Sequence, residues 1–254
     1  MKENKRMNLL TMEHITKAYT DRVLLNDVAF SINENEKIGV IGINGMGKST
    51  LLKVTAGIEP YDEGKISMGK QVKICYLPQT PEFEEGTTVL RAAIADNVNE
   101  LNQWTIEADA RSMLNQLGFY DYDEKVEHMS GGQKKRIALV NALLTPADIL
   151  ILDEPTAGLD PAGRDEILDL IARMHKEKGI TVILVSHSME DVAKYVERII
   201  VMNHGQVMFD NTPCEVFKHY KELEQIGLAA PQVTYLMHEL KEKGLNVNTE
   251  ATTV

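Results

Sequence analysis

Short apolar runs bounded by polar residues recur along this chain. Three of them, at 37–41, 149–152 and 181–186, have the length and the aliphatic or β-branched content that are typical of buried strands. Helical patterns follow or precede these runs. Because strands that alternate with helices form one packed unit, we assign residues 1–79 and 149–208 to an α/β core.

The stretch between the two parts of the core is expected to be helical instead. Residues 105–117 carry an apolar stripe that is typical of a helix packed on a neighbour. We therefore assign 80–148 to a helical subdomain. The stripe consists of Ile106, Ala110, Met113, Leu114 and Leu117.

A short helical extension is predicted at the C-terminal end, over 209–254. A turn and a helix start are expected at 210–213, and an amphipathic helix at 231–240 ends near Gly244. The apolar stripe of this second helix consists of Val233, Leu236, Met237 and Leu240. The pattern leaves two alternatives open, because such a stripe packs either on its own domain or on a second subunit.

A glycine-rich loop, residues 42–49, follows the first of the three strands. It fits the Gly-x-x-x-x-Gly-Lys-Ser/Thr pattern of a phosphate-binding P-loop, and a helical pattern begins where it ends. Glycines let backbone N–H groups turn towards phosphate oxygens, and the helix N-terminus adds partial positive charge. Lys48 can then reach the β- and γ-phosphates of ATP, and the Ser49 hydroxyl can bind Mg²⁺. The predicted contacts are Gly42, Ile43, Asn44, Gly45, Met46, Gly47, Lys48, Ser49 and Thr50.

Two carboxylates, Asp153 and Glu154, end the strand at 149–152. An aspartate in this place beside a P-loop holds Mg²⁺, and a following glutamate can orient or deprotonate the attacking water. A strand cap or a surface ion pair would explain an isolated Asp-Glu pair equally well. The P-loop earlier in the chain favours the catalytic interpretation.

A second candidate anion site lies at 130–133, which reads Ser-Gly-Gly-Gln before a helical pattern. A serine with glycines at a helix start can expose N–H groups to an anion. By itself this string indicates only an N-cap, and it gains weight from the P-loop and the two carboxylates. The residues concerned are Ser130, Gly131, Gly132 and Gln133.

Charge and cysteine content narrow the class of protein. The formal net charge is −11, and residues 80–129 alone hold 11 acidic and 3 basic residues, a net of −8. Non-specific binding to nucleic acid is therefore disfavoured. Cys75 and Cys214 have no metal-ligand spacing, and no apolar run reaches the length of a membrane span, so we expect a cytoplasmic protein.

Taken in order along the chain, these motifs resemble those of ATP-binding cassette (ABC) ATPases, from about Leu9 to Gly205. The resemblance implies a P-loop ABC nucleotide-binding domain with a helical subdomain and a small antiparallel β region. It also implies that the string at 130–133 is the family's signature, which completes the ATP site of a partner subunit. Met129 stands where the family usually has leucine, a nearly volume-conserving change.

Four further residues gain a role only from this resemblance. Tyr19 matches the aromatic residue that stacks on adenine, and Gln79 matches the glutamine that senses Mg²⁺ and the coupling partner. Asp160 matches an aspartate that acts across the dimer. His187 matches the histidine that contacts the γ-phosphate, although a histidine at a strand end is more often structural when judged alone.

The two halves of the chain resemble different branches of the family. Up to about Leu152 the sequence is similar to that of the soluble ABC-F translation factors. From Thr156 onward it is similar to that of the ATPase subunit of energy-coupling-factor importers. A recombinant or designed hybrid would explain a seam at 152–156. An ABC-F protein carries two cassettes and a basic arm, whereas this chain has one cassette and an acidic insert.

From the resemblance we expect Mg²⁺-dependent ATP hydrolysis in a homo- or heterodimer of ABC subunits. The predicted role is to power an importer through a transmembrane coupling subunit, from the inner face of the membrane. The alternative is a soluble ATPase that acts in translation.

Overall fold

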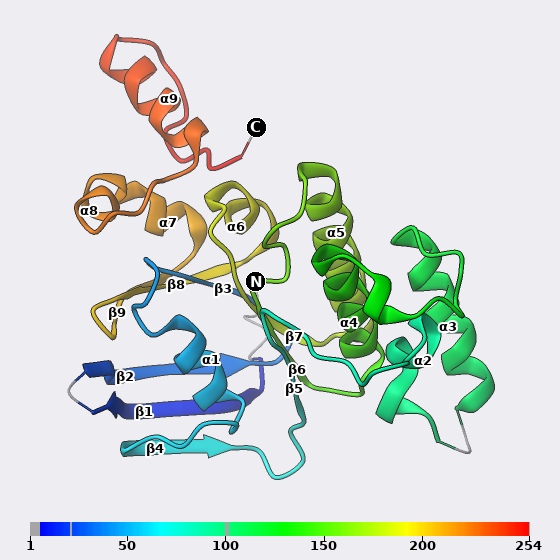
Figure 1. Ribbon diagram of the computed structural model, residues 1–254. Coiled ribbons are helices and arrows are strands. Elements are labelled where there is room, and N and C mark those ends of the chain that lie inside the picture. The colour runs from blue at the N-terminus through cyan, green and yellow to red at the C-terminus, as the bar shows by residue number, and fades with distance from the viewer. Residues whose placement is uncertain (1–5, 21, 100–101, 254) are drawn as a thin grey trace. The chain divides into compact units, whose positions relative to one another are not determined.

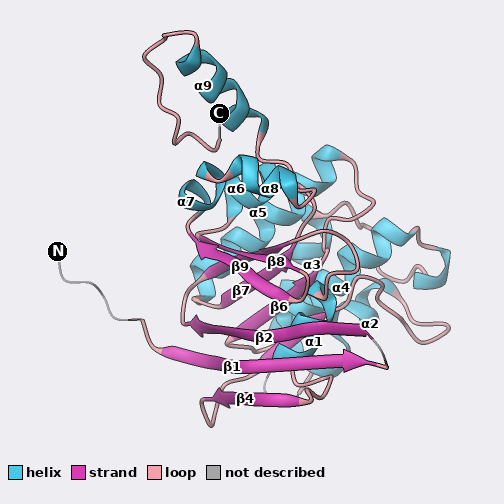
Figure 2. Ribbon diagram, turned by 90° about the vertical axis from the view of Figure 1, so that its left-hand side faces the viewer, coloured by secondary structure: helices cyan, strands magenta, loops and turns pink. Residues whose placement is uncertain are grey.

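The computed structural model describes residues 6–20, 22–99 and 102–253, which form two compact units (Figures 1 and 2). The first unit contains Met1–Gln71 and Val182–Val254, and the second contains Val72–Thr181. The predicted limits at residues 1 and 254 lie outside the described residues. The division at residues 80 and 148, which follows element type rather than compactness, stays a prediction.

A three-stranded antiparallel sheet begins the first unit. It contains β1 (Asn8–Tyr19), β2 (Arg22–Asn33) and β4 (Glu63–Met68) in the order β2-β1-β4. Alternate residues of β1 and β2 point to one side and form part of the core, in the period-two pattern of a half-buried strand. Leu10, Met12, Ile15, Leu25, Val28 and Ile32 are all buried. This sheet is the small antiparallel region that the sequence predicts.

A second set of strands in this unit surrounds β3 (Lys37–Ile41), which confirms the predicted strand. It pairs in parallel with β7 (Thr181–Val185) and with β8 (Arg198–Asn203), and β9 (Gln206–Asn211) pairs antiparallel with β8. The helix α1 (Lys48–Thr55) follows β3 directly. Parallel strands end on the same edge, so the loops after β3 and β7 emerge together there.

The second unit combines a parallel strand pair with helices. The strands are β5 (Ile74–Leu77) and β6 (Ile149–Asp153). The helices are α2 (Val89–Ile94), α3 (Gln103–Gln116), α4 (Gly131–Leu144) and α5 (Pro161–Lys178), with 3₁₀ turns at Ala95–Asn97 and Val126–His128. The helices α2, α3 and α4 contact one another. All five residues of the predicted α3 stripe are buried, which confirms that helix and its packing face.

Four helices complete the first unit. They are α6 (Met189–Tyr195), α7 (Pro213–Lys218), α8 (Tyr220–Gln225) and α9 (Gln232–Glu242). Figure 1 shows α7 beside β8 and β9, and α9 beyond α8. The extension begins later than residue 209, because β9 continues to Asn211 and Thr212 caps the first helix.

The predicted apolar stripe of α9 is only partly covered, because Val233, Met237 and Leu240 are half-buried and Leu236 is exposed. Thr234 is 2% exposed, whereas Leu236 is 52% exposed. The rings of Tyr235 and His238 lie 5.5 and 4.7 Å from the ring of Tyr220. Aromatic contacts in edge-on and tilted arrangements therefore attach α9 to its own domain through Tyr235 and His238, which the aliphatic pattern did not indicate.

Candidate nucleotide-binding site

The P-loop ends in a helix whose N-terminus has no side-chain cap. Gly47 is the N-cap of α1 and adopts the left-handed conformation, with φ 91°. A Cβ atom at this position would lie 2.3 Å from the carbonyl oxygen of Leu24, so only glycine fits. With no side chain bonded across it, the first turn of α1 offers its N–H groups to an anion.

Lys48 lies folded inside this loop. Its side chain is almost fully buried, and Nζ donates to the carbonyl oxygens of Gly42 and Ile43 at 2.7 and 3.0 Å. Burying an ammonium group without partners is costly, and the loop carbonyls offset that cost. The positive charge is therefore held at the helix N-terminus, where a phosphate would bind.

Tyr19 lies close to the same loop. It is paired with Arg22 across the β1–β2 hairpin, and Arg22 Nη2 donates to the carbonyl oxygen of Gly45 at 2.6 Å. The Tyr19 ring is 43% exposed, as a surface for stacking on a planar ligand requires. No local pattern indicates a role for Arg22, because its partner lies 23 positions away.

His187 follows β7, on the edge where the P-loop follows β3. The register pairs Val40 with Val185, two residues before the histidine. His187 is exposed, and Ser188 next to it caps α6 by accepting from the backbone N–H of Asp191. The first unit thus brings the P-loop, Tyr19 and His187 to one region.

The second unit carries the predicted carboxylates at the end of β6. Asp153 is 3% exposed, and the hydroxyl of Tyr76 on β5 donates to its Oδ2 at 3.1 Å. Burial and the nearby charge of Asp153 raise the pKa of Tyr76, so the phenol stays protonated and keeps donating. Tyr76 fixes the direction of the carboxylate, and no pattern within β5 predicted that role.

Glu154 and Gln79, both predicted site residues, contact each other. The carboxamide Nε2 of Gln79 donates to Glu154 Oε2 at 2.7 Å. Glu154 adopts φ 52°, in the left-handed region that residues other than glycine rarely occupy. Such backbone strain is concentrated at functional sites, where the side chain must point in one direction.

The predicted signature forms a self-capped helix start. The backbone N–H of Gln133 donates to Ser130 Oγ at 3.3 Å, and the N–H of Ser130 donates to Gln133 Oε1 at 2.9 Å. This capping box confirms the predicted N-cap.

A cavity of about 630 Å³ adjoins the signature and extends to the loop at 157–160, which includes Asp160. Lys135 on α4 donates from Nζ to the carbonyl oxygen of Ala157 at 2.9 Å and so joins the signature helix to that loop. Burial lowers the pKa of Lys135, and the charges of Glu154 and Asp153 oppose that shift. The sequence analysis did not single out Lys135.

The predicted metal ligands suit Mg²⁺ by their chemistry. Ser49, Gln79 and Asp153 supply a hydroxyl, a carboxamide and a carboxylate, and Mg²⁺ prefers oxygen ligands. Over residues 6–20, 22–99 and 102–253, no group of three or more His, Cys, Asp or Glu side chains could hold a metal ion.

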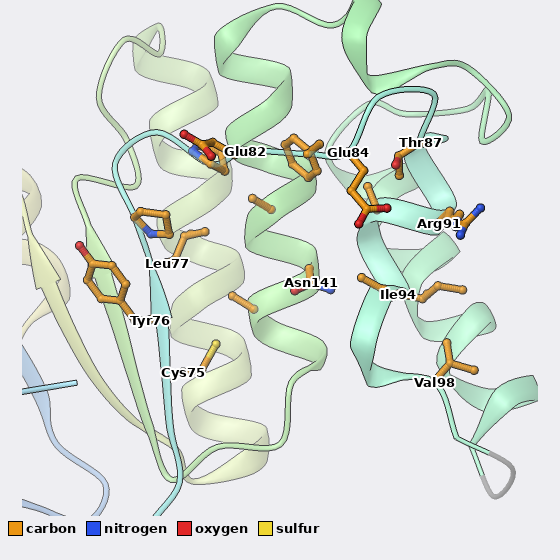
Figure 3. Close-up of a pocket in the computed structure, with 17 residues that line it drawn as sticks. Cys75, Tyr76, Leu77, Glu82, Glu84, Thr87, Arg91, Ile94, Val98 and Asn141 are labelled. Carbon is orange, nitrogen blue, oxygen red and sulfur yellow. The ribbon is translucent and has the colours of Figure 1, made fainter. Parts of the chain in front are cut away.

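A groove of about 650 Å³ opens beside β5 and α2, also within the second unit (Figure 3). Its floor is apolar, with Leu77 from β5 and Ile94 and Val98 from the α2 side. Glu82 and Glu84 lie along one rim, with Arg91 beyond Glu84 in the view. The groove begins immediately before Gln79, the residue that is bonded to Glu154.

Comparison with known proteins gives a consistent result along the chain. A family model described as ABC transporter matches residues 25–157, more than half of the chain. The energy-coupling factor transporter ATP-binding protein EcfA2 of Clostridium tetani is 39% identical, covering 96% of this chain and 93% of its own length. The protein of the same name from Acetivibrio thermocellus is 41% identical and covers 96% and 92%.

Solved structures agree with the fold. An ATP-binding cassette of an ABC transporter in its ADP conformation has a TM-score of 0.71 at 28% identity, over 87% of this chain and 97% of its own. The ATP-binding subunit of an ABC transporter has a TM-score of 0.73 at 27% identity, over 92% and 99%. The predicted fold class is confirmed.

These relatives correct the division of the chain into two family branches. They cover 96% of the chain and so extend over both halves, and they do not support an N-terminal half of ABC-F type, a seam at 152–156 or a hybrid origin. The misleading strings lie at 7–27, 76–83 and 130–144, around Tyr19, Gln79 and the signature. All branches need similar residues there for the same phosphate chemistry, so these strings distinguish branches poorly.

Proposed function

The chain belongs to the ABC transporter family and is an ABC ATPase, and from this we infer that it powers an importer of the energy-coupling-factor type. One observation carries the inference. Its likeness to EcfA2 proteins continues past the ATP-binding motifs to include the C-terminal extension, over 96% of the chain. A bare cassette motif would give no reason to prefer one branch of the family.

In the proposed reaction, the P-loop binds the phosphates of ATP. Lys48 exchanges its two carbonyl partners for the β- and γ-phosphates, and Ser49 with Asp153 and Gln79 would hold Mg²⁺. The ion would neutralise charge that develops on the phosphates. Glu154 accepts a proton from the attacking water, because its left-handed backbone and its bond to Gln79 fix its orientation.

A second ABC subunit completes the site in this proposal. The signature, Ser130–Gln133, and Asp160 line one cavity, so both would act on the nucleotide of the partner subunit. His187 would contact the γ-phosphate, and Tyr19 would stack on the adenine. The partner is a second copy or a related chain.

The exposed Leu236 in the stripe of α9 supports a contact between subunits that needs no nucleotide. Leu236 is 52% exposed although it lies on a helix, and burying apolar surface contributes about 25 cal/mol per Å². We expect Leu236→Glu to weaken the nucleotide-free dimer in light scattering. The matched control is Leu245→Glu, which changes a leucine of similar exposure, 53%, beyond the end of α9. Equal dimerisation of both variants would remove this contact from the proposal.

The groove beside β5 and α2 supports docking of a transmembrane coupling subunit. Its apolar floor suits the apolar side of a helix, and the acidic rim lies in a segment of net charge −8. The docking helix should therefore carry basic residues. Its position next to Gln79 would let docking affect Glu154 through their hydrogen bond.

Within the described part of the chain, no helix has the length and apolar character needed to cross a membrane. In the proposal the subunit lies at the cytoplasmic face and is held there by its transmembrane partner.

Co-purification from native membranes tests this function. We expect one or more integral membrane subunits to accompany the chain, and Glu84→Lys to reduce their recovery. Glu34→Lys is the control, because Glu34 is an exposed acid of the first unit outside the groove. Recovery of ribosomes, or of the chain alone, would contradict the importer role. Equal recovery with both variants would contradict docking at the groove.

A further inference from the structure

A short segment of the C-terminal extension, residues 226–232, connects two parts of the ATP site within the first unit. We call it the strap. Its course is fixed by backbone bonds and burial: the N–H of Gly227 donates to Glu224 O and that of Leu228 to Leu223 O, both at 2.9 Å. Leu228 and Ala230 are 7% and 3% exposed, so the strap is anchored in the core.

One end of the strap lies against the P-loop. Gly227 has φ 78°, and a Cβ atom built there would lie 3.4 Å from Cγ2 of Ile43. Ile43 also provides the carbonyl oxygen that holds Lys48 Nζ at 3.0 Å. When Lys48 leaves this oxygen for a phosphate, the peptide of Ile43 loses a charged partner close to Gly227 of the strap.

The other end lies against the helix that follows His187. The backbone N–H of Gln232, the first residue of α9, donates to Oε1 of Glu190 at 3.4 Å. Glu190 is in the first turn of α6, three residues after the histidine. Two residues earlier in the strap, Ala230 N–H donates to the hydroxyl of Tyr235 on α9 at 3.0 Å, so strap and helix are bonded together.

We propose that the strap is a positioning element that links the P-loop and the His187 segment to the C-terminal helix α9. The proposal rests on the assigned ATP-binding function. Binding of ATP at the P-loop shifts the strap, and the orientation of α9 shifts the affinity for ATP by the same factor, because coupling between two sites is reciprocal. Gly227 and Glu190 are its positioning residues.

The main test adds a side chain at Gly227 without forbidding its backbone. Asparagine tolerates the left-handed conformation better than most residues, so Gly227→Asn chiefly introduces bulk towards Ile43. Gly244→Asn is the matched control, since Gly244 has φ 85° and nothing within 4 Å of a Cβ atom. In calorimetry on the full chain, Gly227→Asn should weaken MgATP binding by about fivefold or more, and Gly244→Asn should leave it unchanged. Equal affinities for the two variants would overturn the proposal.

A double-mutant cycle separates the contact from general damage. Adding Ile43→Ala to Gly227→Asn removes the atom that the new side chain meets. The loss of affinity caused by Gly227→Asn should therefore be smaller in the Ile43→Ala background than in the wild type. Additive effects would show that the contact does not carry the coupling.

Hydrogen exchange on the wild-type chain provides a readout that does not require a P-loop variant. MgATP should change the exchange of the amides at 227–230 and at Gln232, and leave that of β4 unchanged. Glu190→Ala should accelerate exchange at Gln232, and Glu190→Gln, which retains the Oε1 acceptor, should restore it. If the exchange rates of the strap amides are the same with and without MgATP, the coupling is refuted. A wild-type chain that fails to bind MgATP would instead refute the assigned function.

Discussion

The P-loop and the signature loop are both glycine-containing starts of a helix, yet their N-termini differ in how they are satisfied. At α1 the N-cap is Gly47, no side chain caps the turn, and Lys48 lies almost fully buried beneath it. At α4 the chain caps itself, because Ser130 and Gln133 exchange two hydrogen bonds. The first is arranged to receive an anion, and the second already has internal partners.

Because of this difference, we expect the two loops to contribute differently to the affinity for ATP and to the rate of its hydrolysis. The uncapped P-loop, with its buried lysine, has the groups needed to bind a nucleotide within one subunit. The signature has less to offer a lone phosphate, and in the proposed function it completes a site in a second subunit. Variants of the P-loop should therefore change the affinity for ATP. Variants of the signature or of Glu154, both in the second unit, should change the rate of hydrolysis or dimerisation.

The largest expected effect is on turnover, from Glu154→Gln. The substitution retains size and hydrogen bonding to Gln79 but removes the base, so kcat should fall by roughly 10²–10⁴-fold. Affinity for MgATP, measured by calorimetry, should stay near the wild-type value, and an ATP-bound dimer should accumulate in light scattering. Wild-type turnover in this variant would move the base elsewhere, with His187 as the next candidate.

Lys48→Ala should mainly lower the affinity for MgATP. Removing a charged partner of the phosphates costs about 1.5–3 kcal/mol of binding free energy. Calorimetry with MgATP measures this loss, and thermal unfolding of the apo chain controls for damage to the loop that Lys48 holds together. If MgATP affinity is unchanged, the P-loop assignment fails and the comparison between the two regions fails with it.

The success of the sequence analysis differs between these regions for a physical reason. The strand at 37–41, the P-loop and the Ser130 cap were predictable because each depends on residues within a few positions of one another. The bond from Tyr76 to Asp153 spans 77 positions, and local patterns carry no information on such a pair. Its only signal would have been the pairing of β5 with β6.

The helix α9 shows a different limit. Its period predicted a helix correctly, but the aliphatic pattern left open whether the stripe packs on its own domain or on a second subunit. Tyr235 and His238 pack through their rings on Tyr220, and the more hydrophobic Leu236 stays exposed. Hydrophobicity alone ranks leucine above these residues, whereas packing geometry depends on ring shape and on which residue lies opposite.

Ser130→Ala tests the second of the two helix starts, the self-capped N-terminus of α4. Loss of an N-cap costs about 1 kcal/mol of the free energy of unfolding. Thr212→Ala is the control, because Thr212 caps α7 in the same manner and lies outside the candidate site. Both should lower stability in denaturant unfolding by similar amounts, but only Ser130→Ala should also lower kcat. A loss of kcat in both variants would mean that the turnover effect comes from stability alone.

The smallest expected effect tests how far the P-loop depends on its neighbours. Arg22 donates to the carbonyl oxygen of Gly45 at 2.6 Å from an exposed position, so Arg22→Gln removes a charged donor while the β1–β2 hairpin persists. Exposure weakens such a contact, and we expect a loss of about 0.5–1.5 kcal/mol in MgATP affinity, with kcat unchanged. Arg6→Gln is the control, since Arg6 is an exposed arginine bonded to Glu197. A drop in kcat without a change in affinity would assign Arg22 to the chemistry of hydrolysis, and the division between a binding region and a turnover region would then no longer hold.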